Sequence, residues 1–208
     1  MKIEIWSDVM CPFCYIGKRR LEEALAQFPQ KDTVEIEWKS FQLDPATVTD
    51  PDKNVYEYLA EKKGMSVEES KQMHGQVISM AKNAGLEYNF DKAVIANSFD
   101  AHRLMQFAKT KGLGDEAEER IFKGHFTEGV NVADHNELVR LAGEIGLDKD
   151  EAKKVLDSNN FGTVVKSDIA EAQQIGVRGV PFFVIDRKYA VSGAQPVEVF
   201  LGTLQKAI

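Results

Sequence analysis

Cysteine and histidine are scarce in this sequence, which limits the kinds of metal site that the chain can form. Its 208 residues include only two cysteines, Cys11 and Cys14, and four histidines, His74, His102, His125 and His135. A structural zinc ion usually takes four Cys or His ligands, and these histidines occur neither four residues apart nor at zinc-finger spacing. We therefore expect no metal site.

Basic residues and long apolar runs are also in short supply. The net charge of −7 argues against nucleic acid or an anionic membrane as the main partner. No run approaches the roughly 18 apolar residues of a membrane-spanning helix. Residues 1–8 contain acidic side chains and no apolar core, unlike a secretory signal. We expect a cytoplasmic protein, and cytoplasmic cysteine pairs are more often catalytic or redox-sensing than structural.

The two cysteines form a Cys11-Pro12-Phe13-Cys14 motif between a predicted strand and a predicted helix. Residues 3–6 favour a strand, and an apolar helical face follows at Leu21, Ala24, Leu25 and Phe28. Cys11 then falls at the N-cap and Pro12 at the first helical position, where proline is well tolerated. One turn of helix places the two Cβ atoms roughly 5–6 Å apart, so a small adjustment brings the sulfurs into disulfide geometry.

This placement predicts redox chemistry. The helix N-terminus favours a thiolate at Cys11, which attacks a disulfide, and Cys14 then resolves the mixed disulfide. Two other interpretations are half a zinc site and a pair of buried, inert thiols. The strand-to-helix context favours a redox-active pair over both.

The predicted elements run in the order β-α-β, a long helical block, then α-β-β-α. Val34, Ile36 and Trp38 alternate with charged residues, and residues 41–43 extend that strand. About 105 mainly helical residues follow, and an apolar run at 180–185 predicts a buried strand. We predict an α/β fold with a domain formed by residues 1–53 and 159–208, and an inserted α-helical subdomain at 54–158.

Three blocks of sequence resemble the DsbA-like branch of the thioredoxin superfamily, most closely its FrnE-type members. They are Ser7–Arg20 with the cysteine motif, Asn97–Leu104, and Gly179–Phe183 followed by Ser192–Gln195. The resemblance covers nearly the whole chain and implies a thioredoxin-like fold. It also implies that the Val180–Pro181 bond is cis and lies beside the cysteines, where Val180 and Pro181 bind the backbone of a substrate. The dipeptide lacks the histidine of DsbA itself, so the redox character could differ.

The resemblance implies a protein-disulfide oxidoreductase that acts on substrate proteins or on small thiols and disulfides. Phe13 is a further candidate for contact with substrate. Asn97 and His102 are weaker candidates, since a buried, hydrogen-bonded histidine explains His102 equally well. Glutathione or another small thiol would serve as co-substrate, with no metal or nucleotide cofactor. No signal for an oligomeric state is present.

Two other functions remain open at this point. Kappa-class glutathione transferases and 2-hydroxychromene-2-carboxylate isomerases resemble this architecture, but they usually have serine where Cys11 stands. A chaperone-like protein could bind its partners between the two subdomains.

Two local structural predictions remain. The basic run Lys18–Arg20, just after the cysteine motif, is expected to form a solvated helix face. Ser98 is expected to cap the helix that begins directly after it.

Overall fold

The centre of the protein is a four-stranded mixed sheet. The computed structural model describes residues 1–208, and the strands lie in the order β2-β1-β3-β4. They comprise β1 (Lys2–Ser7), β2 (Glu35–Ser40), β3 (Phe182–Ile185) and β4 (Tyr189–Ser192). β1 is parallel to β2 and antiparallel to β3, which is antiparallel to β4. The predicted α/β fold is therefore confirmed, with strands from both ends of the chain in one sheet.

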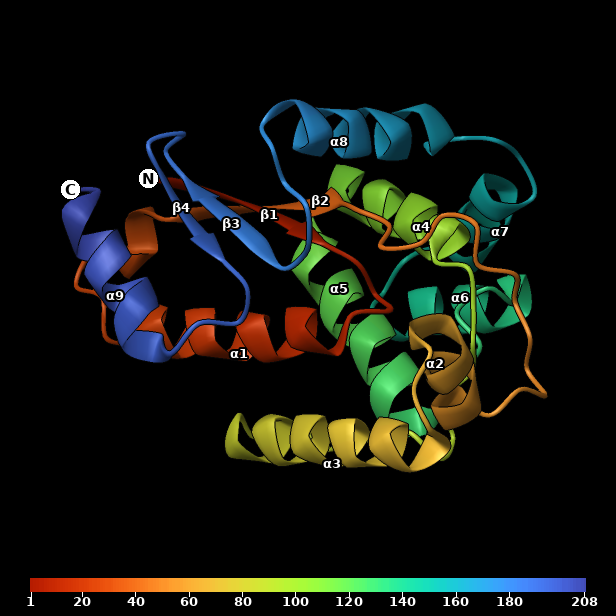
Figure 1. Cartoon of the computed structure of the whole chain (residues 1–208). Coiled ribbons are helices and arrows are strands. Elements are labelled where there is room, and N and C mark those ends of the chain that lie inside the picture. The colour runs from red at the N-terminus through yellow and green to blue at the C-terminus, as the bar shows by residue number, and fades with distance from the viewer.

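One face of the sheet is covered by α1 (Pro12–Ala26) and α9 (Val197–Lys206), as Figure 1 shows. Alternation along β1 sends Ile3 and Ile5 to this face, where they pack with Leu21 of α1 and Phe200 of α9. All four side chains are buried. This core holds the middle of α1 against the sheet, while both cysteines at its start belong to a separate cluster that includes Phe122 and Phe126.

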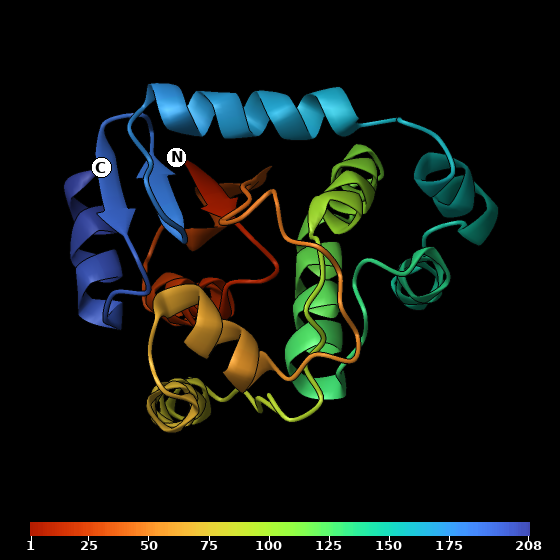
Figure 2. The ribbon, with the colours of Figure 1, turned by 45° about the vertical axis from the view of Figure 1, so that its right-hand side comes forward.

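The opposite face is covered by α8 (Gly162–Gln174), which packs Ala172 against Trp6 of β1 and Val184 of β3. Figure 2 shows α8 running from the sheet across to the helices that follow β2 in the chain. The Trp6 indole N–H donates to the Asp168 carbonyl oxygen at 2.9 Å, so a buried polar group of β1 is satisfied by α8.

Six α-helices follow β2 and precede α8 in the chain. They are α2 (Val55–Lys63), α3 (Val67–Asn83), α4 (Phe99–Thr110), α5 (Gly114–Lys123), α6 (His135–Glu144) and α7 (Lys149–Leu156). Helix α3 lies alongside α1 on the side away from the sheet, and α4, α6 and α7 lie at one end of the sheet (Figures 1 and 2). A 3₁₀ turn (η1, Lys31–Thr33) precedes β2, and a π-helical turn (η2, Gly124–Glu128) extends α5. None of the helices combines the length and the apolar character needed to cross a bilayer. The division of the chain into an inserted helical subdomain at residues 54–158 and a domain formed by the rest stays a prediction.

Two local predictions were wrong. Strand β2 ends at Ser40 rather than continuing to residue 43, because the Leu43 N–H turns away to bond the Asp8 carboxylate at 2.7 Å. Ser98 does not cap α4 with its side chain, because its own backbone is already helical. Asn97 supplies the cap instead, and its Oδ1 accepts from the Phe99 N–H at 3.0 Å.

Gly17 is the residue that lets α1 approach β3. A Cβ at this position would lie 3.0 Å from Pro181 Cγ and 3.2 Å from Phe183 Cζ. Both distances are shorter than ordinary van der Waals contact, and Phe183 is fully buried in a close-packed core. The absence of a side chain at Gly17 therefore sets how closely the segment at Pro181 sits against the cysteine helix.

We expect Gly17→Ala to destabilise the protein, because the added methyl group would displace Pro181 or Phe183. Overpacking of a core typically costs about 1–3 kcal/mol, which exceeds the gain of up to about 1 kcal/mol in helix propensity. Gly202→Ala on α9 is the matched control, because its Cβ would meet nothing within 4 Å. Urea unfolding of both variants measures the difference. Equal stability of Gly17→Ala and Gly202→Ala would contradict this packing argument.

Candidate active site

Both cysteines lie at the N-terminus of α1, directly after β1. Cys11 is the N-cap residue with an extended backbone (φ −94°, ψ 110°), and Pro12 begins the helix. The Cys11 N–H donates to the Asp8 carbonyl oxygen at 2.9 Å, and the Cys14 N–H donates to the Cys11 carbonyl oxygen at 3.0 Å. The two thiols are therefore one helical turn apart, as their spacing in the sequence predicts.

The two thiols differ in accessibility. Both are free rather than joined in a disulfide; Cys11 is 3% exposed and Cys14 is fully buried. Burial raises the pKa of the Cys14 thiol well above its ordinary value, and the neighbouring Cys11 raises it further. Cys11 is thus the thiol at the rim, and Cys14 is held behind it as a neutral thiol. Phe13, between them, is 38% exposed at the same end of the helix.

The segment before β3 lies against Cys11. The Val180–Pro181 peptide bond is cis, as the resemblance implies. Cys11 Sγ donates a weak hydrogen bond to the Val180 carbonyl oxygen at 3.4 Å. Cys11 and Val180, which are 169 positions apart in the chain, are thus in contact at the start of α1. A role for Val180 and Pro181 in binding substrate stays a prediction.

Aromatic side chains enclose the inner side of the cysteine pair. The ring of Tyr15 stacks on Phe122 of α5 with centroids 4.9 Å apart, and Tyr88 stacks on Phe126 at 4.8 Å. The Tyr88 hydroxyl donates to the carbonyl oxygen of Pro12 at 2.7 Å. Burial raises the pKa of the Tyr88 hydroxyl. The helical subdomain therefore excludes water from behind the thiols.

The basic run Lys18–Arg20 is not a solvated face, so that prediction was wrong for Lys18. This residue is only 3% exposed, and its Nζ pairs with Glu22, with Asp115 at 3.2 Å and with Glu119 at 3.3 Å. Burial lowers the pKa of Lys18, but the three carboxylates together raise it by more than burial lowers it. The net shift of the Lys18 pKa is therefore upward. Lys18 is therefore a charged link between α1 and α5.

His102 is buried and does not line the opening of the site. Its Nε2 lies 3.4 Å from Asp8 Oδ1, and the ring has no exposed surface. Asp8 also accepts from the Met10 and Leu43 N–H groups at 3.2 and 2.7 Å. Burial raises the pKa of Asp8, but His102 and these two N–H groups lower it, and the net shift is downward. His102 thus supports the loop that leads into Cys11.

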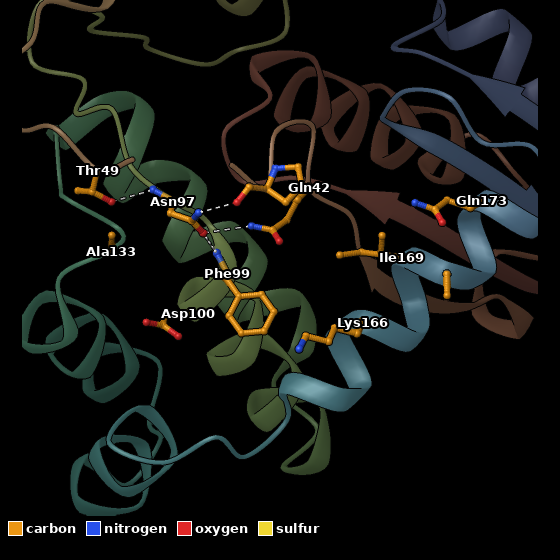
Figure 3. A pocket seen from close by; sticks show the side chains of 11 residues that line it. Gln42, Thr49, Asn97, Phe99, Asp100, Ala133, Lys166, Ile169 and Gln173 are labelled. Carbon is orange, nitrogen blue, oxygen red and sulfur yellow. Dashed lines mark hydrogen bonds between the residues drawn. The ribbon is translucent and has the colours of Figure 1, made fainter. Parts of the chain in front are cut away.

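Asn97 lines a cavity of about 670 Å³ between α8 and the start of α4. Figure 3 shows Lys166, Ile169 and Gln173 of α8 on one side, with Asn97 and Gln42 on the other. The Asn97 amide group is fully occupied, because its Nδ2 donates to two carbonyl oxygens and its Oδ1 accepts from Gln42 and Phe99. Its evident role is to hold the loop after β2.

Two buried polar residues beside the cysteines were overlooked in the sequence. Ser7 is the last residue of β1, and its hydroxyl donates to Glu118 Oε1 of α5 at 2.6 Å. Glu118 is 2% exposed, and burial raises its pKa to about 7. One sequence signal was available: Glu118 stands three and four residues before Ile121 and Phe122, on the apolar side of α5.

The arrangement as a whole is suited to thiol chemistry. No cluster of three or more His, Cys, Asp or Glu side chains is arranged to hold a metal ion. The polar groups around the motif instead hold its backbone, and both thiols are buried, Cys14 completely and Cys11 nearly so.

Comparison with known proteins shows the same architecture. A crystal structure of a probable DsbA oxidoreductase from Streptomyces coelicolor is 41% identical, with a TM-score of 0.94 over 100% of this chain and 89% of that one. A 2-hydroxychromene-2-carboxylate isomerase shares the fold at 16% identity, with a TM-score of 0.73 over 99% of this chain and 95% of that one.

The cytosolic disulfide reductase DsbM from Pseudomonas aeruginosa also shares the fold, at 17% identity and a TM-score of 0.69 over 99% of this chain and 98% of that one. A family model, the DSBA-like thioredoxin domain, matches residues 2–205. With the cysteine pair at the start of α1 and strands from both ends of the chain in one sheet, the protein belongs to the family of DsbA-like thioredoxin domains.

Proposed function

We propose that the protein is a thiol–disulfide oxidoreductase whose reactive pair is Cys11 and Cys14. The observation that carries this proposal is the placement of two free thiols one turn apart at the N-terminus of α1, with Cys11 at the N-cap beside the Val180 carbonyl oxygen and Cys14 fully buried behind it. A nucleophilic thiol needs access to its substrate, and a resolving thiol needs only access to the first sulfur.

The reaction proceeds in two exchanges. The Cys11 thiolate attacks a substrate disulfide, so a mixed disulfide forms and one substrate sulfur leaves as a thiolate. Cys14 then attacks Cys11 Sγ, which closes the Cys11–Cys14 disulfide and releases the second substrate sulfur. Two electrons pass from the protein dithiol to the substrate disulfide, so the dithiol is oxidised and the substrate disulfide is reduced. In the opposite direction a substrate thiolate attacks Cys11 of the oxidised pair.

The substrate backbone is expected to lie along Val180 and Pro181, with Phe13 as an apolar contact at the rim. The proximity of the Val180 carbonyl oxygen to Cys11 supports this placement. We further propose substrate proteins or small disulfides as partners, glutathione or another small thiol as the agent that restores the pair, a cytoplasmic location and a place in the FrnE-type branch. Structures of the cytosolic reductase DsbM, one of them with glutathione, have the same fold.

The competing function is glutathione conjugation or isomerisation, as in the isomerase of the same fold. Such an enzyme needs only a hydrogen-bond donor beside the thiolate of glutathione, and serine suffices at position 11. A second cysteine one turn along the helix would threaten it with an unproductive disulfide. The presence of both sulfurs in this chain therefore favours disulfide exchange.

The test compares the two reactions in wild type and in the Cys11→Ser, Cys14→Ser double variant. We expect wild type to reduce a peptide disulfide in the presence of glutathione, and the double variant to fall to the uncatalysed rate. Conjugation of glutathione to a model electrophile should be slow in both proteins. Efficient conjugation that persists in the double variant would favour the transferase instead.

A further inference from the structure

One tyrosine of the helical segment reaches the backbone between the two cysteines. The Tyr88 hydroxyl donates to the carbonyl oxygen of Pro12 at 2.7 Å, and Tyr88 is 6% exposed. No other side chain forms a hydrogen bond with the backbone of residues 11–14. Pro12 and Phe13 carry no polar side chain of their own. The polar contact inside the motif therefore comes from a residue 76 positions away in the chain.

Both the ring and the backbone of Tyr88 are fixed in this place. The ring stacks on Phe126 with centroids 4.8 Å apart and meets Phe90 edge-on at 5.7 Å. The next residue, Asn89, donates its N–H to the Phe126 carbonyl oxygen at 2.7 Å, which ties the segment to η2. Burial raises the pKa of the Tyr88 hydroxyl, so this group stays protonated and remains a donor. A donor held in this way needs no reorganisation before it acts.

The carbonyl oxygen that Tyr88 contacts belongs to the first peptide unit of α1. This Pro12–Phe13 unit has its N–H on Phe13, among the free N–H groups at the helix N-terminus. Cys11 is the N-cap residue beside these groups, which favour a negative charge there. A hydrogen bond accepted by a carbonyl oxygen polarises its peptide unit, so the N–H of that unit becomes a stronger donor. The Tyr88 hydroxyl can thus influence the charge of Cys11 without contacting the sulfur.

We propose that Tyr88 is a positioning residue that stabilises the reduced pair, with Cys11 as a thiolate, through the Pro12–Phe13 peptide unit. In the disulfide form neither sulfur carries a charge, so that form gains less from the same hydrogen bond. Tyr88 then shifts the equilibrium toward the reduced pair and makes the oxidised pair a stronger oxidant. The proposal rests on the proposed function and names a residue that sets the redox equilibrium of the same site.

Exchange with glutathione is the equilibrium in which this effect is measured. The Cys11–Cys14 bond breaks, a disulfide forms between two glutathione molecules, and two electrons pass from the glutathione sulfurs to the protein sulfurs. Of the two thiol protons that glutathione loses, Cys14 takes one and water takes the other, because Cys11 is left as a thiolate. Removing the Tyr88 hydroxyl should therefore shift this equilibrium toward the protein disulfide.

The test compares wild type with Tyr88→Phe in a series of glutathione buffers, with the two redox forms counted by thiol alkylation and intact mass. Tyr88→Phe removes the hydroxyl and keeps the packed ring. We expect its equilibrium constant for reduction to fall about threefold, or about 14 mV for a two-electron couple. Tyr56→Phe is the matched control, because the hydroxyl it loses donates to Asp91 at 2.8 Å rather than to the motif. This control should match wild type.

Two further measurements distinguish this role from a purely structural one. A variant that only loosens the core loses the same stability in both redox forms, whereas Tyr88→Phe should lose more in the reduced form, by the same threefold factor. Urea unfolding of the oxidised and the reduced protein measures this difference. In a Cys14→Ser background, where Cys11 is the remaining thiol, the pH profile of its reaction with iodoacetamide should have a higher midpoint when Tyr88→Phe is added.

The proposal is wrong if Tyr88→Phe keeps the wild-type equilibrium constant, shifts it toward the reduced pair, or loses equal stability in both redox forms. A wild-type protein that forms no Cys11–Cys14 disulfide in any of the buffers would instead contradict the proposed function itself. The two failures are therefore distinguishable in one series of measurements.

Discussion

Replacing Cys14 with serine should leave the protein covalently joined to its substrate. Cys11 remains at the rim and can still attack, but no second sulfur is available to release the mixed disulfide. Cys11→Ser should instead abolish exchange, because the remaining thiol is fully buried and burial raises its pKa. Non-reducing gels and intact mass measurement after incubation with a peptide disulfide detect the adduct.

A control for this prediction is the double variant, which should neither form the adduct nor catalyse exchange. Added small thiol should release the trapped substrate from Cys14→Ser and partly restore its turnover. Adduct formation by Cys11→Ser at the rate of Cys14→Ser would show that the roles of the two cysteines are reversed.

The second large effect concerns stability. Glu118→Gln should be more stable than wild type at pH 8 by on the order of 3 kcal/mol. The pKa of Glu118 is about 7 in the folded protein, against 4.5 as its ordinary value. The folded state therefore holds this proton more tightly, and wild type loses stability as the pH rises from about 4.5 to 7. Glutamine cannot ionise, and its carbonyl oxygen still accepts from Ser7.

Urea unfolding between pH 5 and pH 8 measures this difference, with Glu116→Gln as the control at an exposed site. The advantage of Glu118→Gln should be small at pH 5 and reach its full size above pH 7. A stability difference that does not change with pH would contradict the raised pKa.

The sequence was sufficient to predict the order of elements and the position of the cysteine pair, because both depend on local patterns. The β propensity of residues 3–6 indicated β1, alternation at 34–39 indicated β2, and the apolar spacing after Cys14 indicated α1. The tight turn between β3 and β4 follows from Asp186 and Arg187, which adopt positive φ angles of 49° and 55°. Each of these sequence patterns spans about ten residues or fewer, so it can be recognised without knowledge of the tertiary contacts.

The roles of the charged residues could not be predicted in the same way, because their partners are remote in the chain. Lys18 looks like one member of a solvated run until α5 places Asp115 and Glu119 beside it. Ser7 and Glu118 are 111 residues apart. Asn97 and His102 were predicted as weaker candidates for substrate contact, and only the structure shows that their polar groups bond the loop after β2 and Asp8, respectively.

The contacts of α5 mean that the thioredoxin-like core of this chain is not a self-sufficient module. From this one helix Asp115 accepts from the Trp38 indole at 2.9 Å, Glu118 accepts from Ser7, and Glu119 pairs with Arg19. Excising the helical segment would expose the resolving thiol and strip polar partners from β1, β2 and α1 together. The helical segment and the core together enclose the cysteine pair, so a change in either sequence is constrained by the other.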